Sequence, residues 1–377
     1  MYSTAKSIKN LIIGAGPSGL AVAGRLAEQK QPFIILEKGQ HVGEAWHHHY
    51  DRLHLHTDRT YSGLPHRPIP KTAPVFVPRQ DLIKYWEEYA DHFSIKPLFG
   101  QEVQRIQRQG DAWVTTTATD TFVSENVIVC TGYNRVPNVP HWPGQELYQG
   151  TLLHSGIYKN AEPFKNKSVL VVGMGNSGAE IALDLSETAR GTYLSLRSPV
   201  NIMRRDLGGK PSQLSAIIMN AVLPDWAYDS LSRFVQKQTV GDLSAYGIRT
   251  PDYAPSAGIR RGHIPVLDVG TIEQIKAGAI EVKSDIQRFT SHGVAFVDGT
   301  RLEVDAVVLA TGYRARVGEF IPELQDAFNE RGCPEQLWYP QWPGLYFLGF
   351  SVPLTGILRG IKLESKKIVK HIVAQGA

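Results

Sequence analysis

The chain has 377 residues, of which 42% are hydrophobic and 20% charged, and its formal net charge is +4. This length suits two or three domains, and the composition is that of a globular protein. We find no apolar run as long as the roughly 18 residues of a membrane span, and the first ten residues lack the apolar core of a signal peptide. These features predict a cytoplasmic protein without a membrane partner. Without a basic stretch interleaved with aromatics, we also expect no nucleic-acid partner.

Residues 11–37 follow the order strand, glycine loop, helix and strand. The loop holds Gly14, Gly16 and Gly19, and the second strand ends at Glu37, 18 residues after the last glycine. In such a loop the glycines permit a tight turn, let a pyrophosphate approach the backbone, and let helix and strand pack closely. The helix N-terminus attracts phosphate, and a carboxylate in the last position binds a ribose diol and repels a 2′-phosphate. The stretch therefore predicts a site for the adenosine half of FAD or NAD.

The same plan occurs a second time. Gly173, Gly175 and Gly178 follow the apolar run 169–172, and a helix follows the glycines. Each loop is followed, more than a hundred residues later, by a Thr-Gly-Tyr tripeptide at 131–133 or 311–313. This repeat predicts an α/β protein with two Rossmann-like dinucleotide-binding domains.

We expect the second domain to be inserted into the first. The predicted boundaries are 1–160 for the first part of an FAD-binding domain, 166–300 for an NADPH-binding domain, and 301–377 for the returning segment. The polar stretch 159–167 is interpreted as the linker, and a hairpin turn is expected at 297–300. Helices are predicted at 81–93, 214–223 and 356–373, with a last strand at 345–349. The mixed region 207–262 fits a lid, a substrate wall or a dimer surface, and the sequence leaves these open.

The residue after the second strand differs in charge between the two copies. The first copy has Glu37, whereas the second has Arg197 followed by Ser198, with Arg204 and Arg205 nearby. An arginine in this position can pair with the 2′-phosphate of NADP. The alternative interpretation is that this arginine is a surface residue in contact with solvent only. We therefore expect FAD at the first site, NADPH at the second, and hydride transfer between them.

A protein with FAD and NADPH is a disulfide reductase, an electron-transfer reductase or a monooxygenase. A disulfide reductase needs a dithiol, but Cys130 and Cys333 lie far apart in the sequence and no CxxC motif exists. A further signal is the segment 148–159, YQGTLLHSGIYK, between the first Thr-Gly-Tyr and the second glycine loop. Its histidine and its aromatic end are consistent with a segment that packs between two nucleotide-binding domains. The alternative interpretation is an ordinary linker that contains a buried histidine.

The two glycine loops, the 148–159 segment and both Thr-Gly-Tyr tripeptides resemble the flavin-containing monooxygenases, the class B flavoprotein monooxygenases. The segment has Tyr148 where the family usually has Phe, and it ends in Tyr-Lys, unlike type I Baeyer–Villiger enzymes. Within the family the chain is most similar to YUCCA-type indole-3-pyruvate monooxygenases, through the stretches 50–56, 169–185 and 250–289. The resemblance extends over nearly the whole chain.

This resemblance implies that NADPH reduces FAD and that the flavin forms a C4a-(hydro)peroxyflavin with O2. One oxygen atom then enters a small organic substrate. Three functions stay open: oxidative decarboxylation of an arylpyruvate such as indole-3-pyruvate, N- or S-oxygenation of amines or sulfides, and an NADPH-flavin reductase that serves a protein partner. A homodimer is also left open.

The resemblance places His56 near the flavin, with a structural loop histidine as the alternative, and Asn176 where it holds NADP+. An acidic substrate would need a cationic anchor, for which Arg52, Arg59, Arg67, Arg79 and Arg359 are available. The run His47–His49 has no carboxylate or thiolate at ligand spacing, so no metal is expected. The candidate cofactor-binding residues are Gly14, Gly16, Pro17, Ser18, Gly19, Glu37, Lys38, Trp46, Thr131, Gly132, Gly173, Gly175, Asn176, Ser177, Gly178, Arg197, Ser198, Thr311, Gly312 and Gly349.

Overall fold

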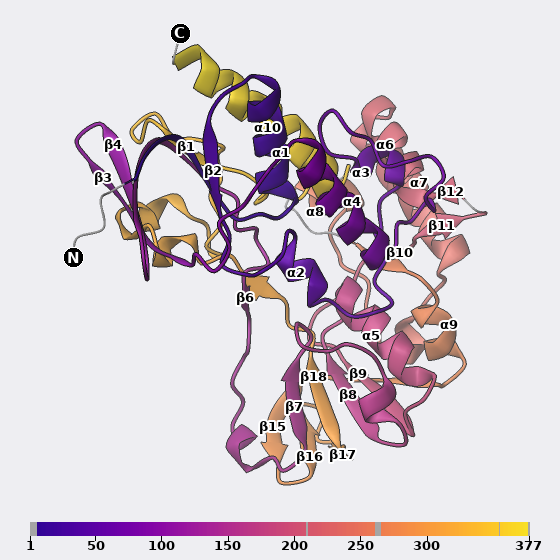
Figure 1. Ribbon diagram of the computed structural model, residues 1–377. Coiled ribbons are helices and arrows are strands. Elements are labelled where there is room, and N and C mark those ends of the chain that lie inside the picture. The colour runs from indigo at the N-terminus through magenta and orange to yellow at the C-terminus, as the bar shows by residue number, and fades with distance from the viewer. Residues whose placement is uncertain (1–5, 209, 261–264, 354, 376–377) are drawn as a thin grey trace. The chain divides into compact units, whose positions relative to one another are not determined.

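The computed structural model describes residues 6–208, 210–260, 265–353 and 355–375, and these form two compact units (Figure 1). Unit 1 consists of Met1–His48, Thr57–Val136 and Tyr313–Ala377, and unit 2 of His49–His56 and Pro137–Gly312. The second unit is thus inserted into the first, and a short segment of eight residues also leaves unit 1 to join unit 2.

The sheet of unit 1 combines parallel and antiparallel strands. Its order is β2 (Phe33–Leu36), β1 (Lys6–Ile13), β5 (Thr121–Val129), β4 (Ala112–Thr117) and β3 (Val103–Gln109), and β20 (Leu345–Phe347) also pairs with β5. Strands β2, β1, β5 and β20 run parallel, whereas β3 and β4 form an antiparallel extension. Parallel strands are buried on both faces, which explains the continuous apolar runs of β1 and β5.

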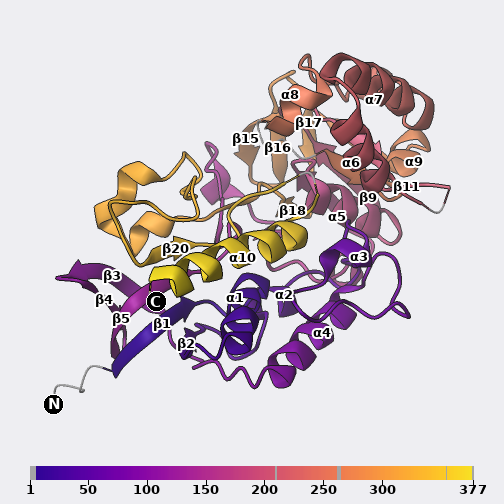
Figure 2. The same ribbon diagram turned by 90° about the horizontal axis from the view of Figure 1, so that it is seen from above.

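Helices cover one face of this sheet. Helix α1 (Pro17–Glu28) lies beside the C-terminal helix α10 (Ile357–Gln375), as Figure 2 shows. On the other face, Leu11 and Val127 pack with Val317 and Phe320 of the returning segment. Helix α4 (Arg79–His92) packs against α1, as expected from its apolar stripe, and α2 (Glu44–His47) and α3 (Arg59–Ser62) are single turns.

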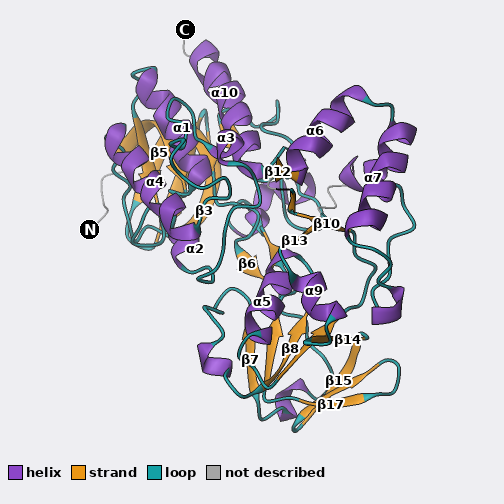
Figure 3. Ribbon diagram, turned by 90° about the vertical axis from the view of Figure 1, so that its right-hand side faces the viewer, coloured by secondary structure: helices purple, strands orange, loops and turns teal. Residues whose placement is uncertain are grey.

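Unit 2 contains a fully parallel sheet. Its order is β14 (Ile280–Lys283), β9 (Gly191–Ser195), β8 (Ser168–Val172), β18 (Ala306–Leu309) and β7 (Thr151–His154). Helices α5 (Asn176–Ser186) and α9 (Thr271–Lys276) lie on one side of it (Figure 3). The antiparallel sheet of β15 (Ile286–Thr290), β16 (Gly293–Phe296) and β17 (Arg301–Glu303) packs on the other side, where Phe289 and Phe296 meet Leu170.

The region 207–262 is mostly helical where it is described. Helix α6 (Ser212–Val222) and helix α7 (Asp225–Thr239) pack together, and α8 (Pro255–Arg260) contacts α7. Residues 209 and 261–264 lie outside the described part of the chain. The remaining short elements are β6 (Val136–Pro137), β10 (Ile202–Arg204), β11 (Asp206–Leu207), β12 (Lys210–Pro211), β13 (Val266–Asp268), β19 (Tyr313–Arg314), and the 3-10 turns Gln145–Leu147, Glu162–Phe164, Ser244–Tyr246, Val317–Glu319 and Pro322–Ala327. Among all described residues, no helix is both long and apolar enough to cross a membrane.

The structure corrects the predicted crossing points between the units. The chain enters unit 2 after Val136, not at the polar stretch 159–167, and it returns after Gly312, not near residue 300. Strand β7 pairs with β18 in the sheet of unit 2, so both strands and everything between them belong to that unit. The supposed linker also carries Phe164, which is buried in the core of unit 2.

Candidate functional site

The first glycine loop joins β1 to α1 in unit 1. Gly14 has a φ of +104°, and a Cβ there would lie 2.8 Å from the carbonyl oxygen of Cys130. A Cβ on Gly19 would lie 2.0 Å from the carbonyl oxygen of Gly14. The protein's own packing therefore requires glycine at the first and third positions.

The middle glycine of each loop is different. A Cβ built on Gly16 or on Gly175 would have no atom within 4 Å among the described residues, apart from those of the glycine itself and its two chain neighbours. Each of these residues precedes a helix N-terminus that has no side-chain cap, so backbone N–H groups are available to a phosphate. The two loops therefore fit a dinucleotide pyrophosphate, since both the space and the donors are present.

Glu37 supports the first loop directly. Its carboxylate accepts hydrogen bonds from the backbone N–H of Ala15 at 2.7 Å and of Gly39 at 2.9 Å, and the residue is buried. Each carboxylate oxygen can accept more than one hydrogen bond, so a ribose diol can bind in addition. Nearby in the fold, Gly349 comes so close to Ser18 that a Cβ would lie 2.2 Å from its hydroxyl oxygen.

The second loop repeats this backbone geometry in unit 2. Gly173 has a φ of +96° and faces the carbonyl oxygen of Ala310, and Gly178 faces the carbonyl oxygen of Gly173. Cys130 and Ala310 are the residues before the two Thr-Gly-Tyr tripeptides, so both copies place the same neighbour beside the loop. The repeat found in the sequence is therefore a repeat in structure.

Asn176 opens helix α5, and its side chain braces the loop. Its Oδ1 accepts a hydrogen bond of 2.7 Å from the backbone N–H of Leu267 in β13. The carbonyl oxygen is therefore engaged by the protein, and the amide NH2 is the group that remains to donate to a coenzyme.

The arginines after β9 have different surroundings. Arg197 and Ser198 are exposed, whereas Arg204 forms an ion pair of 2.9 Å with Glu273. Arg205 is half-buried, and this burial lowers the pKa of its guanidinium. Among the three, Arg197 is the arginine best placed to meet a 2′-phosphate, because it follows β9 directly and is exposed.

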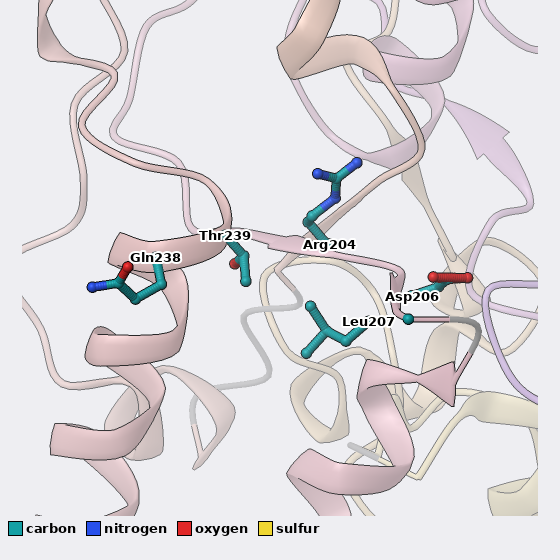
Figure 4. A pocket seen from close by; sticks show the side chains of 6 residues that line it. Arg204, Asp206, Leu207, Gln238 and Thr239 are labelled. Carbon is teal, nitrogen blue, oxygen red and sulfur yellow. The ribbon is translucent and has the colours of Figure 1, made fainter.

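A recess of about 430 Å³ lies in unit 2 beside these arginines (Figure 4). It is lined by Arg204, Asp206, Leu207, Gly208, Gln238 and Thr239, which come from β10, from β11 and the turn after it, and from the end of α7. None of the three loop glycines lines it, so the recess is separate from the phosphate position of the second loop.

His154 ends β7 and belongs to unit 2. Its Nε2 lies 3.0 Å from the carbonyl oxygen of Gly312, and its Nδ1 accepts from the backbone N–H of Gly156 at 3.0 Å. These contacts place the proton of the neutral ring on Nε2, and burial lowers the pKa of this histidine. Thr311 is also engaged within the unit, since its hydroxyl donates to the carbonyl oxygen of Asn138 at 2.6 Å. The 148–159 segment therefore fixes the second Thr-Gly-Tyr tripeptide rather than forming a linker.

His56 lies in the eight-residue segment 49–56 that belongs to unit 2. Its Nε2 is 2.9 Å from Oε1 of Glu180, a buried acid on helix α5. Arg52 of the same segment pairs with Asp184 and Glu187, each at 3.0 Å. The candidate His56 is thus attached to the helix of the second glycine loop.

The remaining candidates lie in unit 1. Trp46 packs edge-on against Trp86 with ring centroids 5.1 Å apart, Lys38 is exposed, and Pro17 and Ser18 form the first turn of α1. Gly132 has a φ of +74° and no neighbour for a Cβ, and it follows the half-buried Thr131. In the described part of the chain, no group of three His, Cys, Asp or Glu residues could hold a metal ion.

The sequence analysis did not predict that Glu180 would hold His56. A usable signal was available for Glu180, since it is an acidic residue among the buried positions Ala179, Ile181 and Ala182 of a helix. A buried acid requires a polar or charged partner, but no pattern in the sequence indicated that this partner would come from segment 49–56.

The fold and the two loops define a flavoprotein of the two-dinucleotide class, and the comparisons with known proteins give its family. A model described as "Flavin-binding monooxygenase-like" matches residues 6–331. The probable indole-3-pyruvate monooxygenase YUCCA9 of Arabidopsis thaliana is 37% identical over 90% of this chain and 84% of its own. The indole-3-pyruvate monooxygenase YUCCA8 of Oryza sativa subsp. japonica is 36% identical over 90% of this chain and 86% of its own.

Among solved structures, a flavin-containing monooxygenase from Stenotrophomonas maltophilia superimposes with a TM-score of 0.73 at 23% identity, over 99% of this chain and 100% of that one. This likeness shows the fold. The chain belongs to the flavin-binding monooxygenase-like family, and it is an FAD- and NADPH-dependent monooxygenase with YUCCA-like sequence. The predicted fold class, family, enzyme class and cofactors are confirmed.

Proposed function

We propose that this enzyme converts an arylpyruvate, such as indole-3-pyruvate, into the arylacetate by oxidative decarboxylation. The 2-oxo acid, O2, NADPH and a proton give the arylacetate, CO2, water and NADP+. The observation that carries the proposal is the 37% identity, over 90% of this chain, with a protein named as a probable indole-3-pyruvate monooxygenase. Amine or sulfide oxygenation and a reductase that serves a protein partner are the alternatives that the experiment below separates.

When bound, FAD and NADPH supply the hydride transfer and the activation of O2. The residues of the chain bind and orient them. We assign FAD to the first loop, where Gly16 leaves room for the pyrophosphate and Glu37 receives the ribose hydroxyls. We assign NADPH to the second loop, with Gly175 at the pyrophosphate, the Asn176 amide as a donor and Arg197 at the 2′-phosphate. His56 and Asn176 are the proposed residues of the oxygen-transfer step.

An arylpyruvate has a carboxylate and an aromatic ring, and both need partners. Three of the five candidate arginines are engaged by acids or carbonyl groups. These are Arg52 with Asp184 and Glu187, Arg67 with Glu88 at 3.4 Å, and Arg79 with the carbonyl oxygens of Trp46 and His47. Their positive charges are therefore already used within the protein.

Arg359 has different surroundings. Its guanidinium lies over the ring of Tyr61, 4.7 Å from the centroid, where α10 meets α3 in unit 1. A guanidinium held on an aromatic face keeps its hydrogen-bond donors free for a carboxylate, and the neighbouring ring offers an apolar surface. We assign Arg359 and Tyr61 as the anchor of the arylpyruvate, with Arg59 of α3 as the second cation.

Oxygen uptake with NADPH across a panel of 2-oxo acids, amines and sulfides, with mass spectrometry of the products, tests the proposal. We expect stoichiometric arylacetate from the arylpyruvate and no oxygenated amine or sulfide. Arg359→Met should raise KM for the arylpyruvate about tenfold or more, whereas Arg67→Met, which removes an arginine near Glu88, should not. A preference for amines or sulfides would replace the proposed reaction, and NADPH use that depends on an added protein acceptor would support the reductase.

The proposal also includes a cytoplasmic location and a homodimer. Both rest on the sequence alone. Light scattering of the purified enzyme measures the oligomeric state, and a monomer at micromolar concentration would remove the dimer from the proposal.

A further inference from the structure

A second exposed arginine lies beside Arg197 in unit 2, just after strand β9. The guanidinium of Arg249 donates a hydrogen bond of 3.4 Å to the backbone carbonyl oxygen of Arg197, 52 positions earlier in the chain. The backbone N–H of Val200 in turn donates to the carbonyl oxygen of Arg249 at 2.9 Å. These two hydrogen bonds hold the segment around Arg249 against the turn that follows β9.

The core of unit 2 anchors the segment that carries this arginine. Leu243 and Ile248 are buried and belong to the hydrophobic cluster of that core. Gly247, which lies between them in the chain, has a φ of +80°, and a Cβ there would lie 3.5 Å from Cγ1 of Val282 in β14. The segment therefore packs against β14, the strand that pairs with β9. Buried neighbours thus determine the position of the backbone at Arg249, while its side chain stays exposed.

Neither of these two arginines is neutralised by an acid. Arg197 and Arg249 are both exposed, and neither forms an ion pair with another residue that the structure describes. Arg204, by contrast, is paired with Glu273. Two neighbouring guanidinium groups of the same charge repel each other, and an anion that contacts both of them removes this repulsion. The pair therefore fits a ligand group that carries more than one negative charge.

The place of the pair in the fold corresponds to one part of the coenzyme. In a Rossmann fold, residues at the end of the second strand contact the 2′ position of the adenosine ribose, and Arg197 lies at this place after β9. A phosphate monoester carries a charge of about −1.5 to −2 at pH 7 and has three acceptor oxygens. One such phosphate can therefore accept hydrogen bonds from two guanidinium groups at once.

We propose that Arg249 binds the 2′-phosphate of NADPH together with Arg197 and so contributes to the selection of NADPH over NADH. The inference rests on the proposed NADPH site at the second glycine loop. The sequence offers Arg197, Arg204 and Arg205 for this role, because they follow the second strand directly. Arg249 lies about 50 positions further along the chain, and only the fold brings its guanidinium to the backbone of Arg197.

Binding of two coenzymes separates phosphate binding from a purely structural role. Arg249 also joins two backbone segments, and a change in that packing would weaken NADP+ and NAD+ alike, since the two differ only in the 2′-phosphate. A lost phosphate contact weakens NADP+ alone. Calorimetric titration of the oxidised, FAD-loaded enzyme with NADP+, and with NAD+ in competition, measures both affinities without turnover. At about pH 8 the phosphate is doubly charged, because its second pKa is about 6.

We expect Arg249→Ala to weaken NADP+ binding about five- to twentyfold, the effect of a charge-assisted contact at an exposed site, and to leave NAD+ binding nearly unchanged. Arg249→Lys keeps the charge without the planar fork and should recover part of the loss. The variant that lacks both Arg197 and Arg249 should lose most of the preference for NADP+. Arg288→Ala removes another exposed arginine of unit 2, on β15, and is the matched control that should keep the wild-type preference.

Thermal unfolding of each variant without coenzyme shows whether it folds, and Arg249→Gln, which keeps a side chain of similar length and amide donors, decides the matter where Arg249→Ala does not fold. A wild-type ratio of NADP+ to NAD+ affinity after loss of Arg249, or an equal loss for both coenzymes, would overturn the inference alone if Arg197→Ala still lowers that ratio. An unchanged ratio in both single variants would overturn the proposed coenzyme site together with it.

Discussion

The two glycine loops of this protein have the same backbone but are supported in different ways. In each, the outer glycines are required by the chain's own packing, and the middle glycine faces open space. The first loop is then held by the buried carboxylate of Glu37, which bonds to Ala15 and Gly39. The second has an exposed arginine at the corresponding place and is braced by Asn176 instead. The comparison leads us to propose that the backbone geometry of the loops provides for a dinucleotide, and that the side chain after the second strand determines which dinucleotide binds.

The largest effects are expected when a side chain is introduced at the middle glycine of each loop, Gly16 or Gly175. Gly16→Val should abolish FAD binding and Gly175→Val should abolish NADP+ binding, because the new side chain would occupy the pyrophosphate position, and its Cβ would not clash with the described protein. The flavin absorbance per protein and a titration with NADP+ measure the two effects. Each variant is the control for the other, so Gly175→Val should retain FAD. Full FAD in Gly16→Val would contradict the assignment of the first loop.

Coenzyme choice sharpens the comparison next. Arg197→Ala should weaken NADPH binding about ten- to hundredfold, as expected when a charge-assisted contact worth about 1.5–3 kcal/mol is lost, and leave NADH binding nearly unchanged. Fluorescence titration with both coenzymes measures the ratio. The matched control is Arg204→Ala, which removes an arginine that is paired with Glu273. A larger loss in the control than in Arg197→Ala would assign the 2′-phosphate to Arg204.

Glu37 tests the other half of the comparison. Glu37→Gln should weaken FAD binding by about tenfold, because one carboxylate oxygen that accepts from the loop is replaced by an NH2 group that faces another N–H. FAD release on dilution, followed by flavin fluorescence, measures this loss. NADP+ affinity, measured in FAD-saturated enzyme, should not change. An unchanged FAD affinity would mean that Glu37 neither stabilises the loop nor binds the ribose hydroxyls.

The smallest expected effect is the pH response of His154, whose ring contacts the carbonyl oxygen of Gly312 in the second Thr-Gly-Tyr tripeptide. Burial lowers its pKa in the folded protein, so the unfolded chain binds a proton more readily. The free energy of unfolding should therefore fall below about pH 6.5, the ordinary histidine value, as the pH drops toward the lowered pKa. Denaturant unfolding at pH 7.5 and 5.5 should show a smaller loss for His154→Gln than for the wild type. An equal loss would remove His154 from this pH dependence.

Much of this architecture was predictable from the sequence because the relevant signals are local. The spacing of the three glycines in each loop is visible within six residues, and the helices at 81–93, 214–223 and 356–373 follow apolar periodicity, as α4, α6 and α10 confirm. The hairpin turn at 297–300 joins β16 to β17, as its Asp-Gly pair predicts. These features need no knowledge of distant partners.

The crossing points and the attachment of His56 were not predictable, because they depend on distant pairings. Whether residue 151 belongs to one unit or the other is decided by pairing with residue 306, more than 150 positions away. A polar composition at 159–167 resembled a linker, yet its one aromatic residue, Phe164, is buried in unit 2. In the same way, the partner of His56 is an acid more than 120 positions further along the chain. Local patterns carry no information on such contacts.

The most direct test of the account is the path of the oxygen atoms. Purified enzyme should be incubated with NADPH, indole-3-pyruvate and 18O2, and the products analysed by mass spectrometry. The account predicts one 18O atom in the carboxylate of the arylacetate, the other in water, and one CO2 per NADPH oxidised. NADPH oxidation that yields stoichiometric hydrogen peroxide, with no label in any organic product, would contradict it.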